Sequence, residues 1–427
     1  MDKNLALFKL PTTDLGVEHV HWIDYRPVSQ SDDGPLEFAV SGAGHQYVDL
    51  KNTKLFIKAK VLKSDGSPIP NIKKDPSGDL NADNINPEAF VGPVNLWLHS
   101  MFSQVQLLMQ QKVISTSNLY PYRSYFESLI YPYERKLGQS ELFYTDNPLN
   151  MDDTKPIIGK NEGFERRATK TARSREIDME GPLHVDLCQQ ERYILNGVDF
   201  GLRFFQSQNA FRLMSDIGEC KVKITDAVLK VCKVDVAASV LKTHQSIMTR
   251  QLTAKYPFER TEMRPFTVMN GVYSFKKSDM FQGEVPQKVV FGFVSAEAFN
   301  GHYQKNPFFL KHCNITQVGL EVDDVPVPQK PLDLSFSDEY CNSAAAFRAL
   351  FEDHPDLSIT RDMFDYGYTL FSITTRQGTP ESLNTVQKGN CTLEIKFGQP
   401  LAENMILIVM AKFPDIMEID EERQISG

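Results

Sequence analysis

The chain has 427 residues, of which 41% are hydrophobic and 24% are charged, and its formal net charge at pH 7 is −9. This length allows two or three domains, and the hydrophobic fraction is sufficient for packed cores. The negative charge argues against a protein that wraps nucleic acid with its whole surface, because such proteins carry dense Lys and Arg. The sequence has no run of 18 apolar residues that would predict a transmembrane helix, and its six cysteines form no C-x-x-C pair.

The first half of the chain predicts a mainly β domain that follows a short arm. Apolar residues alternate with lysines from residue 53 to residue 62, as in a strand with one face on a core. Polar stretches at residues 64–92 and 145–178 predict long loops. Asp235 is placed to cap a helix over residues 236–248, where we expect the domain junction. The predicted arm spans residues 1–16 and the first jelly roll residues 17–234. A connecting helix follows at residues 235–250, and the second jelly roll spans residues 251–427.

The second half repeats the same kinds of element. Apolar residues alternate from residue 288 to residue 294, and residues 405–413 form a strand that is apolar except at Lys412. Asn342 could cap a helix of about ten residues that is rich in Ala and Leu. Each half offers about eight strands in roughly 200 residues, which is the size of a decorated jelly roll. The predicted fold is therefore mostly β, with two tandem jelly-roll β-sandwich domains and short decorating helices.

One pattern occurs in both halves, which suggests an internal duplication. Residues 94–114 read VNLWLHSMFSQVQLLMQQKVI, and residues 307–327 read PFFLKHCNITQVGLEVDDVPV. The offset of 213 residues (312 − 99) pairs His99 with His312 and Gln104 with Gln317. Period-two alternation predicts a strand, a turn and a second strand in each copy. A period near half the chain length indicates two copies of one domain rather than a solenoid.

The histidines have both a functional and a structural interpretation. His19 and His21 could hold a metal from alternate positions of a strand, but no third ligand is evident, so we expect no metal site. His99 and His312 recur at equivalent positions, which is most simply explained by one shared structural niche, such as a hydrogen bond to a neighbouring loop. The sequence contains no P-loop, no G-x-S-x-G elbow and no H-E-x-x-H motif, so we expect no catalytic residues and no cofactor.

Several longer stretches carry a resemblance to a known family. They are GPLEFAVSGAGHQYVDLKNTKLFIKAKV, VGPVNLWLHSMFSQVQLLMQQKVISTSNLYPYRSYFESL, AFNGHYQKNPFFLKHCNITQVGLEVDD, DYGYTLFSIT and FPDIMEID. In these stretches the chain resembles the major capsid (hexon) proteins of Polinton/Maverick elements and the related adintoviruses. They are spread from about residue 17 to residue 420, and none is a catalytic signature.

The resemblance implies a double jelly-roll subunit that is structural rather than enzymatic. Three subunits would form a pseudo-hexagonal capsomer, and capsomers would tile an icosahedral shell that encloses double-stranded DNA. A trimer of two similar domains presents six similar edges, which suits such tiling. The implied partners are further copies of the chain, a minor or penton capsid protein and, only weakly or indirectly, the packaged DNA. The implied location is the virion capsid, preceded by the host cytoplasm or nucleus.

Two segments are candidates for contacts between subunits. The arm has apolar residues that a later sheet core cannot easily bury, so we expect it to dock on a neighbouring subunit through Leu5, Phe8 and Leu10. Residues 160–175 are locally basic and have three interpretations. We rank a solvated loop first, a contact between subunits second and a contact with DNA third. The basic candidates in this segment are Arg166, Arg167, Lys170, Arg173 and Arg175.

Two other functions compete with the structural one. A tandem jelly-roll module that binds carbohydrate or a receptor would present exposed aromatic side chains at its loop tips. An enzyme of the cupin kind would need a cluster of metal ligands, for which His19 and His21 are the only starting point in the sequence. The binding module is the alternative that we retain.

Overall fold

A computed structural model describes most of the chain. The described residues are 16–29, 34–75, 77, 84–130, 138–155, 159–337, 339–351, 359–375 and 387–426. Leu5, Phe8 and Leu10 of the predicted arm lie outside these residues, so their docking stays a prediction. Among the described helices, none is both long and apolar enough to span a membrane.

The first half folds into two four-stranded antiparallel sheets. One has the order β1-β10-β3-β7, from β1 (Val17–Tyr25), β10 (Cys220–Val236), β3 (Tyr47–Lys63) and β7 (Ile177–Pro182). The other has the order β2-β8-β5-β6, from β2 (Leu36–Val40), β8 (Phe200–Gln206), β5 (Phe102–Met109) and β6 (Lys112–Asn118). Leu55 and Ile57 of β3 are fully buried between half-buried lysines, as the alternation predicts.

The second half repeats this strand order. Its first sheet runs β11-β22-β14-β19, from β11 (Ala254–Val268), β22 (Met405–Ile419), β14 (Lys288–Ser295) and β19 (Phe371–Thr374), with β23 (Ile425–Ser426) added to β22. Its second sheet runs β12-β21-β15-β16, from β12 (Ser274–Lys277), β21 (Cys391–Phe397), β15 (Ile315–Val322) and β16 (Val325–Asp333). In chain order, each strand of the two four-stranded orders in one half has a counterpart in the other. The prediction of two tandem jelly rolls is therefore confirmed.

Helices and short strands decorate these sheets. The α-helices are α1 (Trp97–Ser100), α2 (Tyr120–Ile130), α4 (Glu162–Thr171), α5 (Asn209–Arg212), α6 (Ala238–Met248), α7 (Ala296–Asn300), α8 (Ala344–Phe351) and α9 (Arg361–Tyr366). The 3-10 helices are η3 (Pro87–Ala89), η4 (Gln139–Glu141), η5 (Ala172–Ser174) and η6 (Asp186–Cys188). The short strands are β4 (Val91–Pro93), β9 (Leu213–Ser215), β13 (Glu284–Val285), β17 (Ser335–Phe336), β18 (Cys341–Asn342) and β20 (Gln387–Lys388).

The duplicated sequence pattern corresponds to a duplicated hairpin. The β5–β6 turn has positive φ at Gln110 and Gln111, and the β15–β16 turn has positive φ at Asp323 and Asp324. Positive φ at both central residues is typical of the type I′ turn of two-residue hairpins. The register to the neighbouring inner strand also shifts at the same place in β5 and β15, two residues before Val105 and Val318 are reached. Duplication thus extends to a turn and a bulge of the backbone.

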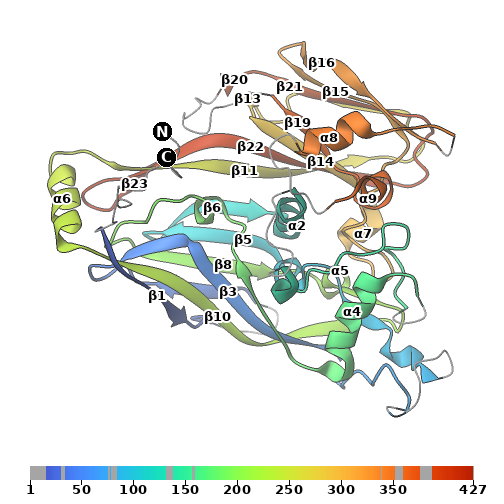
Figure 1. Ribbon diagram of the computed structural model, residues 1–427, viewed down its shortest axis with the longest axis horizontal. Helices are drawn as coiled ribbons and strands as arrows, with labels where there is room; N and C mark the ends of the chain where they lie inside the picture. The colour runs from blue at the N-terminus through green and yellow to red at the C-terminus, as the bar shows by residue number, and fades with distance from the viewer. Residues whose placement is uncertain are drawn as a thin grey trace, which may run out of the picture.

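Each jelly roll has its own hydrophobic core, to which residues of the other half contribute. Figure 1 shows α2 between the sheets of the first half and those of the second. Its Tyr125 stacks on Phe308 of the second half, with ring centroids 4.3 Å apart. In the opposite direction, Tyr256 and Met417 of the second half pack into the core of the first. A junction of this kind makes the two rolls one packed body, because separating them would expose buried aromatic surface.

The connecting helix lies where we expected it, but its N-cap residue differs from the predicted one. Helix α6 begins at Ala238, its N-cap is Ala237, and no side chain caps it. Asp235 still belongs to the segment that pairs with β1, and its carboxylate accepts a hydrogen bond from Gln46 and lies beside His21. The prediction that Asp235 caps this helix is wrong, because the strand continues past it. The division of the chain into domains at this helix stays a prediction.

Candidate functional site

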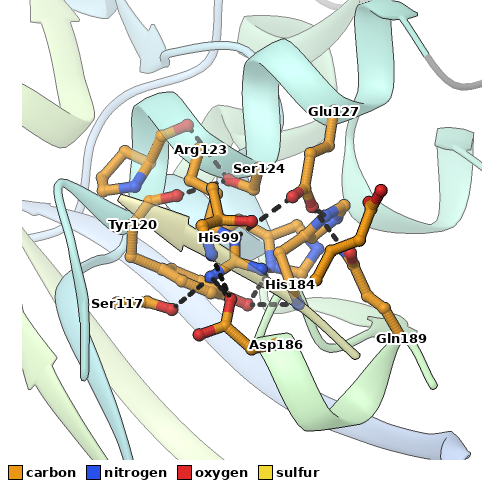
Figure 2. A network of polar contacts seen from close by, with 12 residues as sticks. His99, Ser117, Tyr120, Arg123, Ser124, Glu127, His184, Asp186 and Gln189 are labelled. Atoms are coloured by element: carbon orange, nitrogen blue, oxygen red, sulfur yellow. Dashed lines mark hydrogen bonds and ion pairs between the residues drawn. The ribbon is translucent and has the colours of Figure 1, made fainter. Parts of the chain in front are cut away.

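A buried ionic network lies at the junction of the two jelly rolls. Arg123 of α2 is fully buried and binds Asp186 of η6 at 2.6 Å and Glu127 one turn along α2 at 3.2 Å. Its guanidinium also donates to the hydroxyl of Ser117 on β6. Asp186 accepts in turn from the backbone N–H of Thr261 on β11, which belongs to the second half. This set of five residues, the Arg123 network, therefore connects both halves. Figure 2 labels four of them: Arg123, Glu127, Asp186 and Ser117.

The electrostatics of the Arg123 network keep Glu127 ionised. Burial alone would raise the pKa of Glu127, but the charge of Arg123 and a hydrogen bond from His184 outweigh burial and hold that pKa well below its usual range. Asp186 also accepts from the hydroxyl of Ser115 on β6. A buried ion pair is tolerated best when further hydrogen bonds satisfy both partners. These contacts satisfy both carboxylates and most of the guanidinium, while Nη2 of Arg123 has no hydrogen bond among the described residues.

A second group of polar residues adjoins this network, and we name it the histidine cluster: His99, Glu141 and His184. Nδ1 of His99 lies 3.0 Å from the Tyr120 hydroxyl, and its Nε2 lies 3.1 Å from the carboxylate of Glu141. Nδ1 of His184 lies 2.7 Å from the carboxylate of Glu127. Burial lowers the pKa of His99, so its imidazole is neutral at neutral pH.

The histidine cluster has the composition of a metal site. Its three residues offer ligand atoms that lie within 4.8 Å of one another, and no other such group is found among the described residues. No local spacing in the sequence signals this site, because 42 residues separate His99 from Glu141 and 43 separate Glu141 from His184. The fold brings the three together from α1, η4 and the segment after β7.

A further buried ion pair lies on the predicted basic segment. Arg167 and Asp146 are both fully buried and 2.7 Å apart. Arg167 also donates to two backbone carbonyls, while Asp146 accepts from Asn306 of the second half. The hydroxyl of Tyr368 donates to the backbone carbonyl of Asp146. These four side chains form the Arg167 network, a second polar link between the halves.

The basic segment is a helix rather than a solvated loop. Asn161 caps α4 by accepting from the backbone N–H of Phe164, and one face of the helix buries Phe164 and Ala168. The prediction of a solvated loop is wrong because this amphipathic face packs on β4 and the neighbouring core. Arg167 lies on the buried face, so its predicted contact with another subunit is wrong as well.

The remaining basic candidates stay available for contacts. Arg166, Arg173 and Arg175 are exposed, and Lys170 is half-buried. Their part in contacts between subunits stays a prediction.

The repeated residues differ in how closely their surroundings match. Gln104 and Gln317 occupy the same position after the register shift of β5 and β15, and both are half-buried. His99 is fully buried in the cluster, whereas His312 is half-buried, stacks on Phe336 and accepts from the backbone N–H of Asn314. The prediction that the two histidines fill one niche is therefore wrong. Duplication preserved the backbone position but not the contacts.

Comparison with curated proteins finds one distant relative over the full length. The chain is 21% identical to the uncharacterized protein F54H12.2 of Caenorhabditis elegans, over 96% of this chain and 97% of that protein. No family model matches the chain.

Comparison with solved structures finds the same architecture in viral proteins. A chain in the cryo-EM structure of the Sputnik virophage matches with a TM-score of 0.65 and 11% identity, over 100% of this chain and 92% of that one. The mavirus major capsid protein matches with a TM-score of 0.55 and 12% identity, over 99% and 92%. The Faustovirus major capsid protein matches with a TM-score of 0.55 and 9% identity, over 97% and 92%. The chain therefore has the double jelly-roll fold of these viral capsid proteins along its whole length.

Proposed function

We propose that the chain is a major capsid protein of the kind found in Polinton-like elements. It self-assembles as trimeric pseudo-hexagonal capsomers that tile an icosahedral shell around double-stranded DNA. The observation that carries this proposal is the pair of jelly rolls with one strand order, which together extend from β1 to β23. The matched mavirus and Faustovirus chains of this fold are named major capsid proteins.

The junction supports the proposal physically. Two rolls that share aromatic packing and two buried ionic networks behave as one rigid unit, so each subunit presents two similar lobes at a fixed angle. Three such subunits around one axis give six similar lobes, and closed rotational symmetry is the usual form of a homo-oligomer. A flexible connection between the rolls would not define a pseudo-hexagonal outline. Rigidity at the junction is therefore what a capsomer requires of this chain.

The proposal includes partners and a location. Copies of the chain meet first within the trimer and then between capsomers, and a minor or penton capsid protein fills the vertices. Contact with the packaged DNA is weak or indirect, because the chain has a net charge of −9. The chain acts in the virion capsid, after synthesis in the host cell and assembly in its cytoplasm or nucleus. Its role is structural and not enzymatic, since assembly is carried by surfaces rather than by a reactive group.

Mass measurement and imaging test the trimer. We expect light scattering after size exclusion to give 145.5 kDa, three times the 48.5 kDa of one chain. Negative-stain images of the same fractions should show six-lobed discs or closed shells. A 48.5 kDa monomer that does not associate across a range of salt and pH would contradict the proposal. Glycan arrays would then test the tandem binding module, which does not depend on trimers.

The exposed arginines near α4 allow a test of the predicted contacts. Arg166→Glu together with Arg173→Glu should reduce the fraction of protein in trimers or shells, because a rim charge reversed within an interface repels its partner. Lys242→Glu with Arg250→Glu is the control, since both residues are exposed near α6 and the change in net charge is the same. An equal loss of assembly in both variants would attribute the effect to net charge rather than to a contact at α4.

A further inference from the structure

A carboxylate oxygen in the histidine cluster has no partner in the structure. Glu141 is 2% exposed, and its Oε1 is buried without a hydrogen bond among the described residues, while its Oε2 lies 3.1 Å from Nε2 of His99. Leaving a buried ionised oxygen unsatisfied is costly, and native proteins usually satisfy such an atom with a donor, an ordered water or an ion. The unpartnered oxygen therefore indicates a missing ligand at this position.

The backbone makes room for this carboxylate at a specific place. A Cβ at Gly181 of β7 would lie 2.6 Å from Cδ and 2.7 Å from Oε1 of Glu141. Those distances are too short for any side chain at position 181 unless Glu141 moves. Gly181 thus leaves the space in which the Glu141 carboxylate lies beside the two imidazoles.

The two imidazoles are held from their outer sides. Nδ1 of His184 donates to Glu127, which leaves Nε2 as the ligand atom of this ring. Nδ1 of His99 faces the Tyr120 hydroxyl, a group that can donate or accept, and its Nε2 faces Glu141. Carboxylate or hydroxyl partners on the outer nitrogens are the common second layer around metal-binding histidines, because they fix ring orientation. The rings lie 4.7 Å apart at 88°.

We propose that His99, Glu141 and His184 bind a divalent transition-metal ion of the Zn²⁺ class. Two imidazole nitrogens and one carboxylate suit Zn²⁺ and its neighbours in the first transition row, whereas Ca²⁺ and Mg²⁺ prefer oxygen ligands throughout. The ion would bring a positive charge to the unpartnered oxygen of Glu141. It would also tie α1, η4 and the segment after β7 together next to the Arg123 network. This inference does not depend on the capsid proposal.

Metal titration of the full-length protein tests the site. After treatment with a chelator and its removal, Zn²⁺ alone should bind with a stoichiometry of one per chain by calorimetry and elemental analysis. Saturation should raise the melting temperature by about 3 °C, because the ion binds only the folded chain. Co²⁺ should bind in its place and give visible absorption bands of a nitrogen-ligated site. Ca²⁺ and Mg²⁺ should do neither.

Variants assign the binding to these residues. His184→Gln should weaken Zn²⁺ binding by at least about 100-fold, since changes in the outer layer of metal sites already weaken binding 10–100-fold. Glu141→Gln should have a similar effect, and Gly181→Ala should weaken binding by displacing the carboxylate. His312→Gln is the matched control, because His312 lies outside the cluster and should leave the affinity unchanged.

Two outcomes would overturn the proposal. One is the absence of saturable Zn²⁺ binding to the folded wild-type chain, which would make the cluster a water-filled hydrogen-bond network. The other is binding that His184→Gln leaves unchanged, which would place the ion elsewhere. His184 is the most accessible of the three, with 13% of its side chain exposed, so this variant decides the question even where a substitution of Glu141 prevents folding.

Discussion

The two jelly rolls agree in backbone and differ in how they treat charge. Their strand orders match, and their repeated hairpins share a turn with positive φ and a shift in register. The first roll and its helices bury complete ion pairs, as between Arg167 and Asp146. In the second roll, Lys311 and Glu403 form a pair whose side chains are 29% and 35% exposed. The two rolls thus have the same topology, but their charged side chains differ in burial.

The difference has a structural cause. Helix α2 of the first half lies where the halves meet in Figure 1, and the Arg167 network on α4 reaches Asn306 and Tyr368 of the second half, so the polar side chains of both networks are covered by both rolls. Charges covered from both sides must be paired internally, because no water can reach them. In helices α8 and α9 of the second half, by contrast, Arg348, Arg361 and Asp362 are exposed, so solvent can serve as their partner. Position in the folded chain, rather than strand order, decides which charges are buried in ion pairs.

Breaking a buried pair should have the largest effect on this comparison. Arg167→Ala removes one partner of a fully buried pair and leaves the Asp146 charge unpaired. We expect a loss of about 3–5 kcal/mol in the free energy of unfolding, measured by chemical denaturation. Arg166→Ala, on the exposed face of the same helix, should change stability by less than about 0.5 kcal/mol. Equal effects of the two variants would show that the Arg167 network does not join the halves.

The equivalence of the repeated strands can be tested next. Leu107 of β5 and Leu320 of β15 are both fully buried, each in the core of its own roll. Leu107→Ala and Leu320→Ala should each destabilise the chain by about 3 kcal/mol through lost burial and a cavity, and the two losses should agree within about 1 kcal/mol. Thermal and chemical unfolding of both variants provide the measurement. A loss confined to one variant would mean that only one roll limits cooperative unfolding.

Much of the fold can be predicted from the sequence, because the alternation of apolar and polar residues within a strand indicates which of its faces is buried. The alternation around Leu55 and Ile57 predicts β3, and the repeated pattern around Val105 and Val318 predicts two equivalent hairpins. The helix near residue 240 is also predicted, although its start is not, since β10 continues through Asp235. Local signals of this kind need no knowledge of the partner strand.

The candidate site could not be predicted, because its parts are distant in sequence. Nothing near His99 signals that Glu141 and His184 will face it, because they follow it by 42 and 85 residues. Arg167 reads as one basic residue among several, and only packing against Asp146 shows that it is interior. Networks between elements depend on tertiary structure, so the sequence analysis placed Arg167 in a solvated loop although this residue helps to set the junction.

The two turns offer a subtler comparison. Gln111 and Asp324 both adopt positive φ, of 63° and 64°, but aspartate tolerates this conformation better than glutamine. Gln111→Gly should therefore stabilise the chain by about 1 kcal/mol, and Asp324→Gly by about half as much. Gln111→Ala is the control and should give no gain, since alanine keeps the strained Cβ. Equal gains at both turns would contradict a difference in backbone strain.

The smallest effect concerns the partly exposed charges of the second roll. Burial alone would raise the pKa of Glu403, but hydrogen bonds from Lys311 and Ser295 outweigh it and lower that pKa below its ordinary value of 4.5. A carboxyl whose pKa is lower in the folded state contributes stability above its unfolded pKa and loses it as the pH falls through the folded value. Glu403→Gln should thus flatten the decline of stability below about pH 4.5, by less than about 1 kcal/mol because of solvent screening.

Salt separates this surface pair from the buried one. Raising the ionic strength to 1 M should shrink the effect of Glu403→Gln, because the Debye length falls to about 3 Å. The effect of Arg167→Ala should persist at the same salt concentration, since counterions do not reach a pair with no exposed surface. If salt diminished both effects equally, the Arg167 network would be open to solvent, and the contrast between a charged interior in the first roll and a charged surface in the second would fail.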